Sequence, residues 1–194
     1  MSFGLHQPSS SAGREKWGRI VENIKNAIEG ASLQRLFFAA ASNGGKNARR
    51  TFPAKNDHVI CIHAADGNGN DGGINPDPED DEINFMTLGV AVPLIDEEVG
   101  DVYRTGTSFA TPIAAGIAAN ILAMATDSAP NELSPSARKE MWKPWGMRKT
   151  FRLMATKGEY RYVAPWRLWP ENWQHDPEKR KHVWSEISNK LKGW

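Results

Sequence analysis

The sequence predicts an α/β fold in which a parallel sheet is flanked by helices. Residues 36–41 (LFFAAA) are apolar throughout, as strands of a parallel sheet are when both faces are covered. Residues 106–125 (GTSFATPIAAGIAANILAMA) form a long run with almost no polar face, which is typical of a buried helix. Residues 14–30 repeat apolar side chains with a helical period. Together these three stretches favour an α/β architecture.

The elements follow one another with recognisable ends. Residues 14–30 form an amphipathic helix that Gly30 closes. Residues 59–65 and 83–92 are further apolar strands. Ser134 and Asp176, each followed by Pro, begin two later helices, because an N-cap residue followed by Pro is a helix start signal. The apolar face of the first helix consists of Trp17, Ile20, Val21, Ile24, Ala27 and Ile28.

Length and composition limit the class of protein. A chain of 194 residues fits one domain with an appendage, which we place at residues 1–156 and 157–194. The net charge of +1 gives no electrostatic reason to expect nucleic acid or an anionic membrane as a partner. The single cysteine, Cys61, excludes an internal disulfide framework. No signal peptide is recognisable, so a cytoplasmic location is favoured.

Ser108 stands at the start of the apolar stretch, where two interpretations compete. A helix N-terminus offers backbone N–H groups and the positive end of the helix dipole, and both favour developing negative charge. Serine is also a preferred N-cap residue, which gives a purely structural interpretation. Pro112 is compatible with both interpretations of Ser108, since its missing N–H would have no helical partner near the start of the helix.

The residues around Ser108 favour the chemical interpretation. Residues 106–112 follow the pattern Gly-Thr-Ser-x-Ala-x-Pro, which resembles the nucleophile motif of the subtilisin-like serine peptidases. Residues 1–4, Met-Ser-x-Gly, resemble an internal strand of that family, and the resemblance covers residues 1–127. It implies a subtilisin-like fold and a serine endopeptidase that cleaves peptide or protein substrates through an acyl-enzyme on Ser108.

Asn43 follows the first apolar strand, in the segment AAASNGG at residues 39–45. By itself an Asn-Gly pair indicates a turn. The segment also resembles the Ala-Ala-x-Asn segment of the subtilisin-like family, which implies that Asn43 helps to form the oxyanion hole. In that arrangement the side-chain amide of Asn43 and the backbone N–H of Ser108 converge on the tetrahedral oxyanion.

Two further catalytic residues of such a peptidase have no counterpart in the sequence. In the subtilisin order Asp, His, Ser, the acid and the base would precede Met1. None of the five histidines has the family's motif context: His6, His58, His63, His175 and His182. The chain is therefore expected to be an N-terminally truncated domain that is inactive alone, and a second chain carrying the Asp and His segments is its expected partner. The alternative is a non-catalytic remnant that binds peptides or another chain.

Residues 66–82 (DGNGNDGGINPDPEDDE) contain little to bury and indicate a solvated acidic loop. Asp66, Asn68 and Asn70 begin like a calcium loop, but Asp71 and Asp77 stand where such a loop has Gly and Glu. We expect no cofactor, with calcium in this loop as the alternative.

The last part of the chain is rich in tryptophan, with seven of the eight Trp residues between Trp142 and Trp194. Either these side chains pack on the domain, or they form a partner-binding surface, since Trp is a common interface anchor. We favour packing, because large exposed apolar patches are uncommon.

Overall fold

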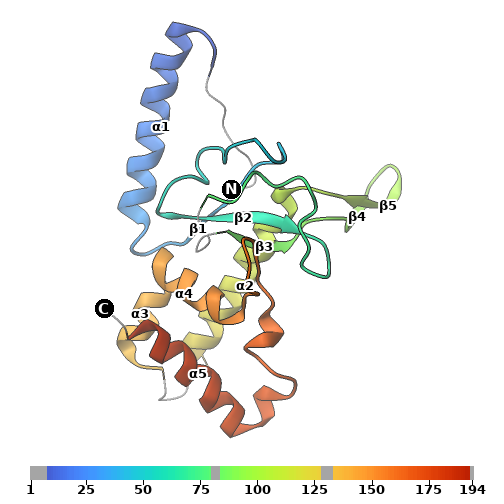
Figure 1. The fold of residues 1–194 in the computed structure, drawn as a ribbon. Coiled ribbons are helices and arrows are strands. Elements are labelled where there is room, and N and C mark those ends of the chain that lie inside the picture. Colours follow the sequence, from blue (N-terminus) through green and yellow to red (C-terminus); the bar gives the residue numbers. More distant parts are fainter. Residues whose placement is uncertain (1–7, 80–83, 128–132, 193–194) are drawn as a thin grey trace.

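The protein is an α/β structure built on a parallel sheet, which has four strands in the described part of the chain (Figure 1). A computed structural model describes residues 8–79, 84–127 and 133–192. The strand expected at residues 1–4 lies outside this described part. The helices and strands, in chain order, are α1 (Ser11–Ala31), β1 (Phe37–Ala40), β2 (Val59–Ala65), β3 (Phe85–Leu88), β4 (Val92–Asp96), β5 (Gly100–Arg104), α2 (Thr107–Asp127), α3 (Pro135–Met141), α4 (Pro144–Met154), β6 (Arg161–Tyr162) and α5 (Pro177–Leu191).

The central sheet has the strand order β1-β2-β3-β6, and every neighbouring pair is parallel. All seven residues of β2 are buried, which confirms the apolar-strand reasoning for a parallel sheet covered on both faces. Alternate residues of β2 face different layers. Ile60 and Ile62 join the core cluster that contains α2, whereas Val59 and Cys61 join the cluster that contains Ile28 of α1. The predicted fold class, a parallel sheet flanked by helices, is confirmed.

Helix α2 packs on β1, β2 and β3. Residues Thr107–Thr126 are long and apolar enough to cross a membrane by length and composition alone, but the helix lies against the sheet. The sequence predicted a helix buried all round, and that prediction is wrong for one stripe. Six small or polar residues spaced along one side of the helix are exposed: Pro112, Gly116, Ala119, Asn120, Ala123 and Thr126. The sheet covers only the opposite side, where Ala110, Ala114 and Ala118 are buried.

Helices α3, α4 and α5 continue the same core. Trp184 of α5 is fully buried and Trp169 is 9% exposed, and both belong to the cluster that contains α2 and the sheet. Strand β6 adds to β3 with Phe85 opposite Arg161. The tail therefore packs mainly inward, although Trp166 is 64% exposed. The division of the chain at residue 156 stays a prediction.

Two features of the fold extend away from the sheet (Figure 1). Helix α1 begins at an N-cap, Ser10, which accepts a hydrogen bond from Gly13 N–H, and only Ile28 near its end is buried. Strands β4 and β5 form an antiparallel hairpin, in which Asp96 Oδ1 accepts hydrogen bonds from the N–H groups of Glu98 and Val99. This hairpin was not expected from the sequence.

Candidate active site

Asn43 and Ser108 come from two elements that end and begin at the same edge of the sheet. Asn43 lies three residues after β1, and Ser108 lies in the first turn of α2. The chain enters α2 from β5, and just before the helix Gly106 N–H donates to the oxygen of Gly89, the residue after β3, at 2.8 Å. In open α/β sheets the carboxyl ends of the strands are the usual place for a ligand site.

The side chain of Asn43 contacts the start of α2 directly. Its Oδ1 accepts hydrogen bonds from the backbone N–H of Thr107 at 2.8 Å and from Thr107 Oγ1 at 2.9 Å, across 64 residues of sequence. The amide therefore satisfies one of the orphan N–H groups that every helix start presents. Because its oxygen is engaged with the helix, the Nδ2 of Asn43 keeps two N–H donors for another acceptor. Asn43 is exposed, so such an acceptor can come from outside the chain.

Ser108 is the second residue of α2 and is partly buried. The helix begins at Thr107, so Ser108 lies inside the first turn rather than at the capping position. The N–H of Thr107 is held by Asn43, and the N–H of Phe109 donates to Gly106 O at 3.0 Å. The backbone N–H of Ser108 lies between these two, at the positive end of the helix dipole. An oxyanion is favoured at this position.

The start of α2 is held close to β3 by two buried contacts. Thr87 Oγ1 donates to Ala110 O at 2.7 Å. Gly89 lies where a side chain would collide: a Cβ there would stand 2.7 Å from Ala64 Cβ and 2.9 Å from Ala110 Cβ. Glycine at this position therefore allows the helix start and the sheet to approach closely.

The backbone just before Asn43 is strained. Ser42 has a φ of 147°, in the region that glycine favours, and its Oγ accepts a hydrogen bond from Gly44 N–H at 3.3 Å. Non-glycine residues in such conformations concentrate at functional sites, where the surrounding structure holds them. The strain at Ser42 supports a functional role for the turn that carries Asn43.

His63 belongs to the core and not to this site. It is fully buried in β2, its Nδ1 lies 3.2 Å from Phe85 O, and its ring packs against the edge of Tyr160. Burial, together with the nearby charge of Arg50, lowers the pKa of His63 to about 3. Burial also raises the pKa of the Cys61 thiol, on the same strand face, to about 12. Both side chains are therefore neutral near pH 7.

The acidic loop uses its first carboxylates internally. Asp66 Oδ1 accepts from the N–H groups of Asn68 and Asn70, and the side-chain hydrogen bond from Asn70, the first of several, lowers the pKa of Asp66. Asp71 Oδ1 accepts from Asn75 Nδ2 at 2.6 Å. Within the described residues, no group of three or more His, Cys, Asp or Glu side chains could hold a metal ion. The expectation of no cofactor, with calcium in this loop as the alternative, stays a prediction.

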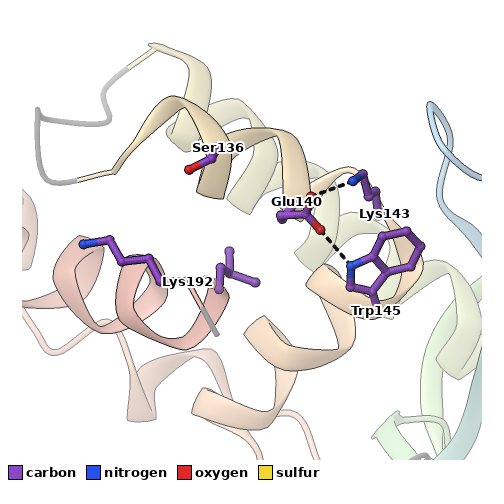
Figure 2. Close-up of a pocket in the computed structure, with 6 residues that line it drawn as sticks. Ser136, Glu140, Lys143, Trp145 and Lys192 are labelled. Atoms are coloured by element: carbon purple, nitrogen blue, oxygen red, sulfur yellow. Dashed lines mark hydrogen bonds and ion pairs between the residues drawn. The ribbon is translucent and has the colours of Figure 1, made fainter. Parts of the chain in front are cut away.

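A cavity of about 710 Å³ lies between α3, α4 and α5, in a different part of the fold (Figure 2). Glu140, which lines the cavity, already accepts hydrogen bonds from Lys143 Nζ at 2.5 Å and Trp145 Nε1 at 2.7 Å. The lining contains neither Asn43 nor Ser108. The cavity therefore gives no support to chemistry at Ser108.

Sequence reasoning missed the residues that hold the site together. Thr107 lies inside the recognised motif, so its role as a donor to Asn43 could have been suspected from position alone. Gly89 and Thr87 carry no motif, and their contacts become visible only once β3 and α2 are packed.

Comparisons with known proteins agree with this fold. No family model and no curated protein matches the sequence. Among solved structures, the prenylagaramide maturation protease PagA matches with a TM-score of 0.55 and 18% identity, covering 100% of this chain and 61% of that one. A lanthipeptide protease gives a TM-score of 0.63 and 18% identity, covering 86% of this chain and 59% of that one. The PatG macrocyclase in complex with peptide gives a TM-score of 0.55 and 16% identity, covering 88% of this chain and 48% of that one.

The chain thus spans about half to three fifths of the length of these proteins. At such identities the likeness is one of fold. These neighbours show that the chain shares its fold with solved maturation proteases, which agrees with the α/β fold expected from the sequence.

Proposed function

We propose that this chain is the nucleophile-bearing part of a serine endopeptidase. Ser108 Oγ attacks the carbonyl carbon of a peptide bond, and Asn43 Nδ2 and the backbone N–H of Ser108 donate to the oxyanion. The observation that carries the proposal is the pair of hydrogen bonds from Thr107 to Asn43 Oδ1. They fix the amide of Asn43 at the start of the helix on which Ser108 lies, and preorganised donors of this kind stabilise transition-state charge.

The reaction needs a general base, and none of the five histidines of the sequence has the motif context of the catalytic histidine in subtilisin-like peptidases. The proton of Ser108 must pass to a base and then to the leaving amine, after which water releases the acyl group. His63 is committed to the core through its contacts with Phe85 and Tyr160. We therefore propose that a separate segment or chain supplies the imidazole and its orienting carboxylate, and that this chain alone does not turn over peptides.

The fold offers a place for that segment. Among the strands that the structure describes, β1 lies at the edge of the sheet, and edge strands pair readily with an added strand. The exposed stripe of α2, from Pro112 to Thr126, begins one turn after Ser108. A strand added beside β1 with a helix on this stripe would bring its own carboxyl end to the edge of the sheet that holds Asn43.

A peptide is the proposed substrate. The neighbours PagA and the lanthipeptide protease are proteases, and PatG was solved with a peptide bound, which supports a peptidase-type function. No bound group is needed for acyl transfer by serine, so we propose no cofactor.

Active-site labelling tests the proposal. A tagged copy of the chain is incubated with a fluorophosphonate probe in an extract of its own source cells, where any partner is present. We expect label on Ser108, loss of label in Ser108→Ala, and labelling slowed about a hundredfold or more in Asn43→Leu. Ser134→Ala is the matched control, because Ser134 also stands at a helix start.

Two results would contradict the proposal. Absence of label on Ser108 in the extract would favour the non-catalytic binding remnant. Rapid labelling of the purified chain by itself would show that the base is already present, and would refute the need for a second chain.

A further inference from the structure

A cavity of about 440 Å³ adjoins Asn43 on the side of the sheet covered by α1. Ser42 and Gly44, the two neighbours of Asn43, both line it, and Trp17 of α1 contributes to its wall. Its volume lies within the range of small-ligand sites. A peptide whose carbonyl oxygen reaches Asn43 would therefore have a side chain next to this cavity.

The cavity is cationic. Arg49, Arg50 and Lys55 line it, and the lining residues that the structure describes include no carboxylate. The rest of the wall is formed by aromatic, small and hydroxyl side chains, such as Phe52 and Thr51. Arg50 is paired with Glu79, so the cavity keeps an excess of positive charge from Arg49 and Lys55, which would attract an anion and repel a cation.

Arg50 is the buried charged residue in the wall of this cavity. It is only 4% exposed, which is unusual for an arginine. Its guanidinium donates to Asn84 Oδ1 and forms an ion pair with Glu79, with Nη1 3.8 Å from a carboxylate oxygen that stands on an exposed side chain. Its Nε is buried and has no hydrogen-bond partner among the described residues. A buried donor without a partner costs free energy, so an acceptor that reached this Nε would be bound favourably.

We propose that this cavity binds the side-chain carboxylate of an acidic residue in the peptide substrate, and so selects Asp or Glu at the residue whose carbonyl is attacked. The inference rests on the proposed function, because Asn43 determines which peptide carbonyl, and therefore which side chain of the substrate, lies beside the cavity. A carboxylate is the planar acceptor that a guanidinium fork fits best. Arg49 and Lys55, which are exposed, add attraction at the mouth.

Peptide binding tests the inference without requiring catalysis. Two peptides that differ in one residue, acetyl-Ala-Ala-Ala-Glu-amide and acetyl-Ala-Ala-Ala-Gln-amide, are titrated into the full chain and followed by NMR, including the Arg Nε–H signals. We expect the Glu peptide to bind about tenfold tighter or more, since charge-assisted hydrogen bonds are the stronger class. We also expect it to shift the Arg50 Nε–H signal.

Variants identify the cavity as the cause. Arg50→Gln should abolish the preference for Glu, and because this buried residue also supports the fold, the exposed double variant Arg49→Gln with Lys55→Gln provides a second test that should reduce the preference. Lys46→Gln is the matched control, since it removes one charge from the same loop but does not line the cavity. Ser108→Ala should leave the preference unchanged, so failure at the nucleophile and failure at this cavity can be told apart.

Equal affinity for the two peptides would overturn the proposal, as would the lack of saturable binding by either. Free glutarate serves as a probe for the source of the carboxylate. If glutarate binds as tightly as the Glu peptide, the cavity is a site for small free anions and does not read a peptide side chain.

Discussion

Replacing His63 with phenylalanine should weaken the dependence of the free energy of unfolding on pH. His63 is fully buried, and burial with the neighbouring Arg50 charge lowers its pKa from 6.5 to about 3. Between these values the unfolded chain binds a proton on this residue and the folded chain does not. The contribution of His63 to the free energy of unfolding is therefore fully present above pH 6.5 and is lost as the pH falls towards 3.

The size of the effect follows from the pKa difference. Each pH unit well inside that window removes about 1.4 kcal/mol of unfolding free energy. Between about pH 7 and about pH 4.5 the wild-type chain should lose about 2–3 kcal/mol through His63. Phenylalanine does not titrate, and it keeps an aromatic ring against Tyr160, which lies 5.2 Å from the imidazole centroid.

Urea unfolding at several pH values measures this difference. Carboxylates contribute to both proteins, so the comparison is between the two slopes and not between absolute stabilities. His182→Gln is the control, because it removes an imidazole from an exposed position and should follow the wild type. Parallel pH profiles for wild type and His63→Phe would show that His63 is protonated in the folded chain, and the reasoning about its burial would be wrong.

Three further substitutions test the packing around the candidate site and the tail. Gly89→Ala should destabilise the chain by about 1–3 kcal/mol in urea unfolding, because the new methyl would stand 2.9 Å from Ala110 Cβ; unchanged stability would mean that the start of α2 can move freely. Thr107→Val should slow labelling of the nucleophile severalfold with little change in folding, because it removes the 2.9 Å hydrogen bond to Asn43 but keeps the backbone one; an unchanged rate would show that the backbone bond is sufficient. Asp176→Ala should lower the melting temperature through the loss of about 1 kcal/mol of N-cap energy, and an unaltered melting curve would show that α5 is held by its core contacts alone.

The main layers of the fold could be predicted from local patterns. The apolar runs at β1 and β2 have the length and composition of covered parallel strands, and the caps at Ser134 and Asp176 mark the starts of α3 and α5 where they were expected. The β4–β5 hairpin was missed because its side chains are mostly exposed, with Ile95 at 85%, so burial leaves little pattern in the sequence. The exposed stripe of α2 was missed because small residues such as Ala and Gly count as apolar in the sequence pattern, whether they are buried or exposed in the structure.

The candidate site was predictable as residue types but not as contacts. The motif around Ser108 and the Asn-Gly segment indicated which side chains to compare. Their meeting depends on pairing that spans 64 residues, and on the close approach at Gly89, which no local pattern encodes. The cluster of positive charges beside Asn43 could not be predicted either. Arg49, Arg50 and Lys55 line one cavity only when the loop after β1 folds against α1.

The amide of Asn43 has two tasks, and they set stability against chemistry. Its oxygen caps α2, and its nitrogen is the proposed oxyanion donor. An aspartate of the same shape would keep the oxygen and add a negative charge that the helix start favours. The same change would remove the donor and repel an oxyanion. Selection for a more stable chain at this position therefore runs towards aspartate, and asparagine would persist there only while hydrolysis is required.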